Sequence, residues 1–466
     1  MCGIFGIYAP ERDVARLAHF GLLALQHRGQ ESAGIAVTDD GHLLVLRDMG
    51  LVAQVFTEEK LRGLAGQAAI GHTRYSTTGS TMWTNAQPSV QHGNGRAVAL
   101  GHNGNLTNTA ELREELVAGG ARLKSTSDTE VIAALVARNE RPLEEAIAAA
   151  MARIEGAYAI VLLSEGKLAG FRDPDGIRPL SLGRLDGDWV LASESCAFDL
   201  LGAKLVREVA PGELVVIDGE GLRSVQAVEP KGAGALCIFE LIYFARPDSK
   251  LLGDELYGTR TRMGERLAAE APVEADVVLP IPDSGVAAAI GFARASGIPY
   301  SEGLIKNRYV GRTFIQPDQA LREHGIRTKF NALEEVAGKR VVVVDDSIVR
   351  GTTTRKIVAM LFEAGATEVH VRVSSPPIVS PCFYGIDMAT EAELVAATRS
   401  VEEVRAHLGA TSLAYLSLAG LQWATRHPAE EFCRACLTRA YPTRIPANRT
   451  LAKLRFEHRP ATVSQP

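Results

Sequence analysis

The chain has 466 residues, of which 46% are hydrophobic and 23% charged, and its formal net charge is −5. This length predicts two or three domains with ample core. The negative charge argues against general nucleic-acid binding. No stretch has the length and apolarity of a membrane span, and residues 1–8 lack the basic region that begins a signal peptide. We therefore expect a cytoplasmic enzyme with reduced thiols and no membrane partner.

The second residue is a cysteine, and it can become the first. Removal of Met1, which a small second residue permits, would leave Cys2 with a thiol and a free α-amine. The α-amine has an ordinary pKa of about 7.7–8.0, so near neutral pH it can serve as a base for its own thiol. The N-terminus alone fits an ordinary buried cysteine equally well.

The first half of the chain mixes short apolar runs with many turns, which predicts an α+β domain with a large sheet. Apolar residues recur at helical spacing after Asp128 and predict a helix there (Val131, Ile132, Leu135 and Val136). A glycine-rich, irregular stretch at 219–235 predicts a domain boundary, so that the first domain spans residues 2–230.

The second half alternates strands with helices. Apolar strands are expected at 276–281, 341–344 and 369–373, with a helix after each of the first two. Continuous apolar strands separated by helices predict a parallel sheet covered on both faces. We assign residues 231–440 to this second domain. The basic, proline-interrupted residues 441–466 are expected to form a surface extension.

The strongest motif lies at residues 341–354, VVVVDDSIVRGTTT. A buried strand ends in two acids, Asp345 and Asp346, and a loop with one glycine then enters a helix through three threonines. Backbone N–H groups at a helix N-terminus, with nearby hydroxyls, form an anion site. Carboxylates beside a phosphate suggest ribose hydroxyls or hydrated Mg²⁺ as their partners. In open α/β sheets such ligands bind at the carboxyl ends of strands.

This run resembles the phosphoribosyl pyrophosphate (PRPP) loop of the type I phosphoribosyltransferases. The segment 281–285, IPDSG, resembles the pyrophosphate loop of that family, and the basic stretch 306–313 resembles its catalytic lid. A closed lid would keep water from a ribosyl cation-like transition state. The resemblance implies a Mg²⁺ site at Ser284, Asp345 and Asp346. It implies PRPP binding by Asp345, Asp346, Ser347, Arg350, Gly351, Thr352, Thr353, Lys306 and Arg308.

Three further motifs in the first half are complementary to glutamine: HTRYST at 72–77, GHNGN at 101–105 and SDTE at 127–130. Each is weak alone, because a single Arg or Asp is usually a surface ion pair and Asn-Gly is usually a turn. Together they supply an arginine fork for the α-carboxylate and an aspartate for the α-ammonium. They also supply an Asn amide and a backbone N–H for the oxyanion formed when a thiolate attacks the side-chain amide.

With CGIFG at residues 2–6, these motifs resemble the N-terminal-nucleophile glutamine amidotransferases over residues 2–230. The resemblance implies an αββα sandwich in which Cys2 is the nucleophile and its amine the base. It implies that Asn103 and Gly104 form the oxyanion hole. Glutamine would then be bound by Arg74, Thr77 and Asp128.

The two halves together resemble the amidophosphoribosyltransferase family along nearly the whole chain, including residues 172–180 and 237–249. The resemblance implies that glutamine, PRPP and water give 5-phosphoribosylamine, glutamate and pyrophosphate, the first committed step of purine synthesis. Members of the family pass ammonia through a transient internal channel, form homodimers or homotetramers, and are inhibited by purine nucleotides. The residues themselves give no independent sign of oligomerisation or inhibition.

Four of the six cysteines could form one tetrahedral site: Cys237, Cys382, Cys433 and Cys436. Four thiolates suit either Zn²⁺ or an iron–sulfur cluster, and spacing does not choose between these and metal-free thiols. The resemblance to the iron–sulfur-containing branch of the family implies a [4Fe–4S] cluster. Members of that branch commonly begin with a short propeptide before the cysteine, whereas only Met1 precedes Cys2 here.

Two other functions compete with this interpretation. An amidotransferase with a sugar-phosphate acceptor would need a sugar isomerase domain in place of the PRPP loop. A PRPP-sensing regulator that binds nucleic acid would need a basic face or a DNA-binding module, and the net charge of −5 and the intact Cys2 count against it. PRPP-stimulated glutamine hydrolysis with pyrophosphate release separates an enzyme from a regulator.

Overall fold

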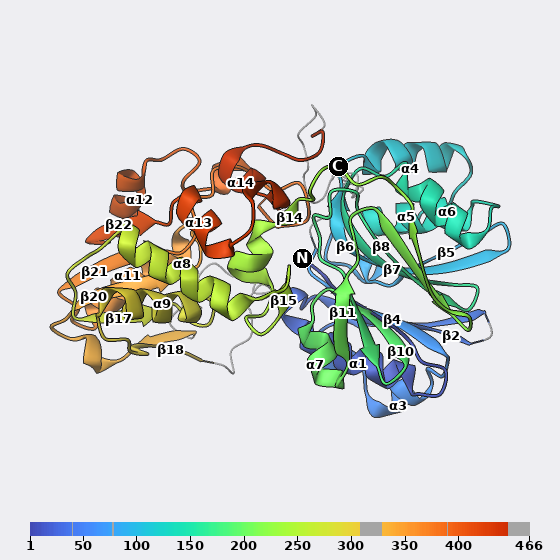
Figure 1. Ribbon diagram of the computed structural model, residues 1–466, viewed down its shortest axis with the longest axis horizontal. Helices are drawn as coiled ribbons and strands as arrows, with labels where there is room; N and C mark the ends of the chain where they lie inside the picture. Colours follow the sequence, from blue (N-terminus) through green and yellow to red (C-terminus); the bar gives the residue numbers. More distant parts are fainter. Residues whose placement is uncertain (40, 77–78, 308–328, 389, 446–466) are drawn as a thin grey trace, which may run out of the picture.

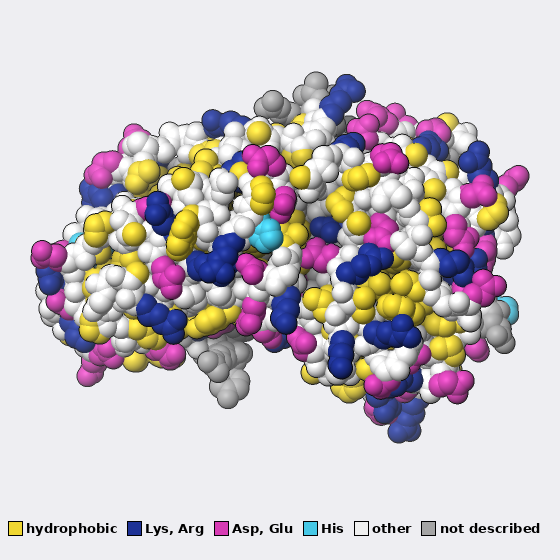
Figure 2. All heavy atoms as spheres, in the orientation of Figure 1, with side chains coloured by type: hydrophobic (Ala, Val, Ile, Leu, Met, Phe, Trp, Pro, Cys, Tyr) yellow, Lys and Arg dark blue, Asp and Glu magenta, His cyan; other side chains and the backbone are white. Residues whose placement is uncertain are grey.

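The computed structural model describes residues 1–39, 41–76, 79–307, 329–388 and 390–445, which form two lobes (Figure 1). The first lobe, blue to green in the figure, contains two large antiparallel sheets. The second lobe, yellow to red, contains a smaller parallel sheet. On the face drawn in Figure 2, acidic and basic side chains alternate over both lobes. No helix in the described part of the chain has the length and apolarity needed to cross a membrane.

The two sheets of the first lobe have seven and six strands. The first has the order β11 (Lys204–Glu208), β9 (Ser181–Leu185), β10 (Asp188–Ala192), β1 (Gly3–Tyr8), β4 (Ala68–Arg74), β2 (Ser32–Asp39) and β3 (His42–Met49). The second has the order β13 (Gly221–Gln226), β12 (Glu213–Asp218), β8 (Lys167–Arg172), β7 (Gly156–Ser164), β6 (Arg96–Leu106) and β5 (Ser89–Gly93).

The sheets of the first lobe pack face to face and are covered by helices on their outer sides. Side chains from both sheets, such as Ile4 and Ile70 from one and Val161 and Leu168 from the other, form one buried cluster. Helices α1 (Val14–Ala24) and α7 (Cys196–Leu201) cover the first sheet, while α4 (Thr109–Ala118), α5 (Asp128–Ala137) and α6 (Leu143–Met151) cover the second. The αββα sandwich and the helix after Asp128 are thus confirmed.

The second lobe has a parallel sheet buried on both faces, as predicted. Its order is β17 (Val277–Pro280), β20 (Arg340–Asp345), β21 (Glu368–Val373) and β22 (Ser412–Tyr415). Alternate residues of β20 point to opposite faces, so Val342 and Val344 join one core and Val341 and Val343 the other. Helices α8 (Leu256–Glu270), α9 (Val286–Ser296) and α13 (Leu418–Thr425) cover the first face, and α11 (Thr352–Glu363) and α12 (Val401–Leu408) the second.

The connection between the lobes is more regular than its glycine content predicts. Residues 221–226 form β13, an edge strand paired with β12, because Gly221 takes a φ of 105° at the hairpin turn. The chain leaves this sheet at Gln226 and enters the short strand β14 (Leu236–Cys237), which pairs in parallel with β23 (Phe432–Cys433). The boundary at residue 230 stays a prediction.

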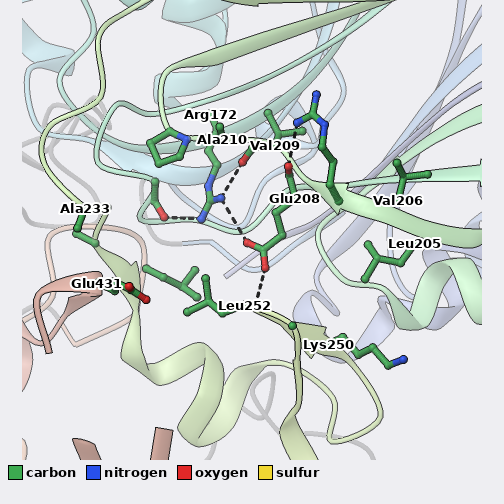
Figure 3. Close-up of a pocket in the computed structure, with 17 residues that line it drawn as sticks. Arg172, Leu205, Val206, Glu208, Val209, Ala210, Ala233, Lys250, Leu252 and Glu431 are labelled. Carbon is green, nitrogen blue, oxygen red and sulfur yellow. Dashed lines mark hydrogen bonds and ion pairs between the residues drawn. The ribbon is translucent and has the colours of Figure 1, made fainter. Parts of the chain in front are cut away.

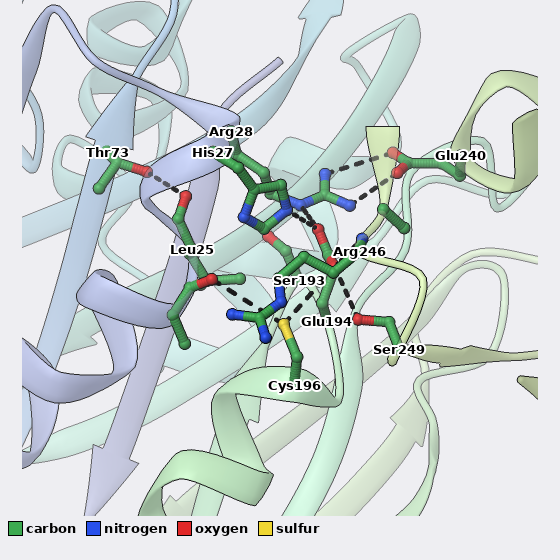
Figure 4. Close-up of polar contacts among 12 residues, drawn as sticks. Leu25, His27, Arg28, Thr73, Ser193, Glu194, Cys196, Glu240, Arg246 and Ser249 are labelled. Carbon is green, nitrogen blue, oxygen red and sulfur yellow. Dashed lines mark hydrogen bonds and ion pairs between the residues drawn. The ribbon is translucent and has the colours of Figure 1, made fainter. Parts of the chain in front are cut away.

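A buried ion network joins the lobes (Figure 4). Arg28, which follows α1, donates to Glu194 of the first lobe and, at 2.6 Å, to Glu240 of the second. His27 lies 2.7 Å from Glu194, and Arg178 lies 3.5 Å from Glu240. Burial opposes ionisation of Glu194, but the neighbouring Arg28 and His27 hold its pKa well below the ordinary value. The charges therefore compensate one another only while the lobes stay together.

Removing one charge from this network should weaken the whole protein. The Glu240→Gln variant keeps the shape of the side chain but leaves Arg28 and Arg178 with less compensating charge in a site without solvent. We expect a loss of about 3 kcal/mol in the free energy of unfolding, measured by urea denaturation. As a control, Glu402→Gln breaks an exposed pair with Arg405 and should leave the midpoint unchanged. Equal midpoints for the two variants would contradict this role of Glu240.

Candidate active sites

Cys2 lies just before the central strand β1 and is buried against β6. Its backbone nitrogen donates to Oδ1 of Asn103 at 3.1 Å, and its thiol lies 3.6 Å from the carbonyl oxygen of Tyr75. Asn103 is fully buried, and its Nδ2 has no hydrogen-bond partner among the described residues. A buried amide N–H without a partner is costly. It is therefore a donor available to a substrate oxygen beside the thiol.

Gly104 follows in the same strand, at a place where no other residue fits. Its φ is 151°, and a Cβ there would lie 2.0 Å from the carbonyl oxygen of Ala157. The preceding His102 is fixed by a 2.8 Å hydrogen bond from its backbone nitrogen to the side chain of Gln87. Strand β6 thus presents Asn103 and Gly104 together, as an oxyanion hole requires. Gln87 was missed because no motif links it to residues 101–105.

The two residues predicted to clamp glutamine lie at the ends of neighbouring elements. Arg74 ends β4, is 2% exposed, and donates to the carbonyl oxygen of Ser80 at 3.1 Å. Asp128 begins α5 and accepts from the backbone nitrogen of Leu106 at 3.0 Å. Burial opposes ionisation of Asp128, but His102 and the backbone N–H groups of Leu106 and Thr129 together outweigh it and lower the pKa. The carboxylate therefore stays charged, as binding an ammonium requires. Thr77 lies outside the described residues.

A loop of the second lobe forms one wall of this site. Asn105 donates to the carbonyl oxygen of Phe383 at 3.0 Å, and Tyr75 donates to Asp387 at 3.4 Å. Arg178 donates to the carbonyl oxygen of Tyr384 at 2.9 Å and also contacts the buried Met1. Sequence motifs could not reveal this wall, because its contacts join residues more than 200 positions apart.

The second site lies at the carboxyl ends of β17 and β20. Because these parallel strands pair Pro280 with Val344, the loops 281–285 and 346–351 emerge side by side. Asp345 ends β20 and is 7% exposed. Burial and the adjacent Asp346 raise its pKa. Burial also raises the pKa of Asp346, although the hydroxyls of Ser284 and Ser347 bond to its carboxylate. The structure thus brings Ser284 to the acid pair.

The phosphate loop reaches α11 through Gly351, whose φ of 74° places the first turn of the helix beyond the acids. Ser347, Thr352 and Thr353 are in this loop and turn. Arg350 is half exposed and pairs with Glu393. On the other side, Lys306 ends β18 (Leu304–Lys306) and contacts Asp283 of the pyrophosphate loop. Arg308 and most of the predicted lid lie outside the described residues.

One cation near the acid pair was not predicted. Arg260 of α8 is buried, and its charge favours ionisation of Asp346. The same guanidinium donates to the backbone oxygens of Leu241 and Ala245, at 2.8 and 2.6 Å. It therefore connects the acid pair with the segment that carries Glu240. No loop motif surrounds Arg260 in the sequence, so nothing there distinguishes it from a surface arginine.

The donor set at the acid pair suits Mg²⁺. Two carboxylates and a hydroxyl are hard oxygen ligands, and a divalent cation would relieve the repulsion that raises the pKa of Asp345. Within the described part of the chain, however, no cluster of three or more His, Cys, Asp or Glu side chains has the arrangement of a metal site.

The four cysteines of the predicted cluster gather at the edge of the second lobe. Cys237 and Cys433 face each other across the β14–β23 pair. Cys436 lies in α14 (Ala435–Thr438), which bonds through its backbone to residues 379 and 380, next to Cys382. Burial raises the pKa of Cys237 to about 11. Burial and then the other three thiols raise the pKa of Cys436 well above its ordinary value. The other three thiols are thus close enough to Cys436 to affect its ionisation, although the four side chains, all of them described, do not have the arrangement of a metal site.

A cavity of about 490 Å³ lies between β11 and residues 250–253, and none of the predicted site residues lines it (Figure 3). Two of its charged side chains are already engaged. Arg172 donates to the backbone oxygens of Gly176 and Val209, and Glu208 accepts from the backbone nitrogen of Leu252. The contact between Glu208 and Leu252 fastens the start of the second lobe to the first.

Comparison with known proteins identifies both halves. A family profile described as a glutamine amidotransferase domain matches residues 72–199, and one described as a phosphoribosyl transferase domain matches residues 260–375. The amidophosphoribosyltransferase of Synechococcus elongatus is 54% identical over 98% of this chain and 94% of its own. Those of Mycobacterium tuberculosis and Bacillus subtilis are 50% and 48% identical, over 98% and 95% of this chain and 89% and 94% of theirs.

Solved structures agree with the sequence relatives. The glutamine PRPP amidotransferase from B. subtilis, complexed with ADP and GMP, superposes with a TM-score of 0.91 at 47% identity, covering 97% of this chain and 100% of that one. A structure described as the allosteric regulatory enzyme of purine biosynthesis gives a TM-score of 0.92 at 47% identity, covering 97% of this chain and 98% of that one. Because sequence and structure agree over nearly the whole length, the chain belongs to the amidophosphoribosyltransferase family.

Proposed function

We propose that the two lobes divide the reaction of the family between them. The first releases ammonia from glutamine at Cys2, and the second transfers it to C1 of PRPP, giving 5-phosphoribosylamine, glutamate and pyrophosphate in the first step of purine biosynthesis. The observation that carries the proposal is the placement of Asn103. Its Oδ1 holds the nitrogen of Cys2, and its Nδ2, buried without a partner in the described structure, is available to the substrate oxygen.

In the first lobe the thiolate of Cys2 attacks the side-chain amide carbon of glutamine. The α-amine of Cys2, freed by removal of Met1, takes the thiol proton and passes it to the departing ammonia. Asn103 and the backbone N–H of Gly104 donate to the oxyanion. Water then hydrolyses the thioester to glutamate. Arg74, Thr77 and Asp128 hold the glutamine, with Asp128 kept ionised by His102.

In the second lobe the carboxylates of Asp345 and Asp346 hold the ribose hydroxyls, and the turn at residues 347–353 holds the 5-phosphate at the N-terminus of α11. Lys306, Arg308 and Arg350 supply positive charge for the phosphates. Asp345, Asp346 and Ser284 would hold Mg²⁺, which would supply positive charge to neutralise the leaving pyrophosphate. Domain limits of 2–230, 231–440 and 441–466 fit this division, because β13 ends at Gln226 and β14 begins at Leu236.

Two further properties of the family extend to this chain as proposals: a homodimer or homotetramer in the cytoplasm, and feedback inhibition by purine nucleotides. The B. subtilis relative carries ADP and GMP in its crystal structure, which supports nucleotide binding here. Ammonia would pass between the lobes, away from water. No contact of this chain with nucleic acid or membrane is part of the proposal.

A [4Fe–4S] cluster at Cys237, Cys382, Cys433 and Cys436 would tie together three segments distant in sequence. The gathering of four thiols, three of them buried, supports this. After burial, the other three thiols raise the pKa of Cys436, and a cluster would remove that repulsion. The chemistry that the cluster supplies is structural. Tyr384 donates its backbone N–H to the sulfur of Cys382, at 3.4 Å, as second-sphere donors do around cluster sulfurs.

Replacing the nucleophile should separate the two activities. In Cys2→Ser the hydroxyl cannot ionise as a thiol does, so we expect glutamine-dependent synthesis of phosphoribosylamine to fall by at least about 10³-fold. Synthesis from added ammonia, which bypasses the first lobe, should remain nearly unchanged. Both rates are measured as PRPP-dependent pyrophosphate release. An equal loss of both activities would contradict the division between the lobes.

Neutralising the acid pair should stabilise the protein while it destroys PRPP binding. The raised pKa of Asp345 means that its ionisation destabilises the fold, increasingly as the pH rises through that pKa. In Asp345→Asn we expect ligand-free stability to rise by about 1–2 kcal/mol in mildly alkaline buffer, with the gain vanishing toward the ordinary carboxyl pKa of about 3.9. Thermal unfolding across pH and PRPP titration measure the two effects. Lower stability at alkaline pH would contradict the repulsion argument.

The cluster is tested by anaerobic purification followed by absorbance and by iron, sulfide and zinc analysis. We expect about four irons and four sulfides per chain, with a broad visible band. Cys433→Ser should lose that band, whereas Cys196→Ser should keep it, because Cys196 is buried elsewhere, beside Glu194. Stoichiometric zinc would assign the thiols to a zinc site. Metal-free, colourless and active protein would show that the four thiols bind no metal and serve only in core packing.

A further inference from the structure

The loop at residues 382–388 comes so close to the predicted oxyanion hole that a residue with a side chain at position 385 would clash with it. Gly385 has a φ of 100°, and a Cβ on it would lie 2.9 Å from the carbonyl oxygen of Gly104 and 3.0 Å from its carbonyl carbon. The backbones of the two lobes thus meet at two glycines. Gly104 is also held in β6 by pairing with β7, where a Cβ on it would lie 2.0 Å from the carbonyl oxygen of Ala157.

Contacts on both sides of Gly385 hold the loop in place. Before it, the carbonyl oxygens of Phe383 and Tyr384 accept from Asn105 and Arg178 of the first lobe. After it, the carboxylate of Asp387 accepts from the hydroxyl of Tyr75, whose carbonyl oxygen lies 3.6 Å from the thiol of Cys2. Asn105 is next to Gly104, and Tyr75 is next to Arg74, whereas Arg178 contacts Met1, the residue before Cys2. Together with the approach of Gly385 to Gly104, the loop therefore bears on the glutamine site at three points.

We propose that the glutamine site is completed by the second lobe, with Gly385 as a positioning residue that fixes Gly104. This rests on the proposed role of Gly104 in the oxyanion hole. Gly385 touches neither glutamine nor the thiol. It presses on the Cα and carbonyl group of Gly104 and through them fixes where the N–H of Gly104 stands. Donors stabilise an oxyanion only when they are placed to within a few tenths of an ångström. The face that Gly385 offers must therefore be bare backbone.

The test compares two glycine-to-alanine variants matched in backbone strain. Gly385→Ala forces a methyl group against Gly104. Gly221→Ala, at a φ of 105° in the hairpin before β13, meets nothing within 4 Å. For Gly385→Ala we expect kcat for glutamine hydrolysis to fall by about 10- to 100-fold. The KM for glutamine should change little, because Arg74 and Asp128 are untouched. For Gly221→Ala both constants should match those of the unaltered chain.

Two additional measurements distinguish positioning from general damage. Ammonia-dependent synthesis should be unchanged in Gly385→Ala, because that reaction does not use the oxyanion hole. The rate at which iodoacetamide alkylates Cys2, followed by mass spectrometry, should also be unchanged, because that reaction forms no oxyanion. Unchanged glutamine turnover in Gly385→Ala would overturn the proposal. So would an equal loss of turnover, alkylation and ammonia-dependent synthesis, which would indicate misfolding of both lobes.

The outcome can be separated from failure of the proposed function. If Cys2→Ser abolishes glutamine-dependent activity while Gly385→Ala retains it, the assignment of the nucleophile stands and the positioning role is wrong. If Cys2→Ser keeps that activity, the proposed function itself fails. A third variant, Asp387→Asn, retains an acceptor for the hydroxyl of Tyr75 and adds no bulk near Gly104. In Asp387→Asn, kcat for glutamine hydrolysis should stay above about half of the value for the unaltered chain, whereas in Gly385→Ala it should fall by about 10- to 100-fold.

Discussion

The buried ion network around Arg28 is the constraint on which the rest of the structure depends. A guanidinium without access to water needs compensating carboxylates, and these come from Glu194 in one lobe and Glu240 in the other. Such a network enforces a relative placement more strictly than apolar packing does, because each displaced charge remains buried and uncompensated. The close approach of Gly385 to Gly104 is possible only because the lobes cannot slide.

The two sites use charge in opposite ways. Despite burial, His102 and the backbone of Leu106 lower the pKa of Asp128, so this carboxylate is ionised before any ligand binds. At the acid pair, burial and the adjacent Asp346 raise the pKa of Asp345, so the ligand-free site disfavours two negative charges. In the proposed function, the first carboxylate is ready for an ammonium group, whereas the second pair would be relieved by the ribose hydroxyls and a cation.

Sequence motifs predicted what local chain order determines. The strand that ends in Asp345 and Asp346, the helix after Asp128 and the parallel sheet covered on both faces were all predicted and confirmed. The role of Asn103 as an oxyanion donor stays a prediction, although the motif did bring its side chain to the nitrogen of Cys2. Gln87, Arg260, Glu240 and Gly385 could not be predicted, because their partners are set by tertiary packing. Residues 221–226, which seemed irregular from their glycines, form a strand because pairing with β12 outweighs local preference.

The wall that Gly385 and its neighbours add to the glutamine site limits how such proteins can be rearranged. A glutamine-hydrolysing lobe can be regarded as an independent module that can be fused to any domain that consumes ammonia. Here a new partner would have to present a bare stretch of backbone opposite Gly104 and acceptors for Asn105 and Arg178. If an intact first lobe were fused to a new domain, its glutamine hydrolysis would be impaired until the new domain carried such a surface. We therefore expect the interface residues of the two lobes to change together during evolution.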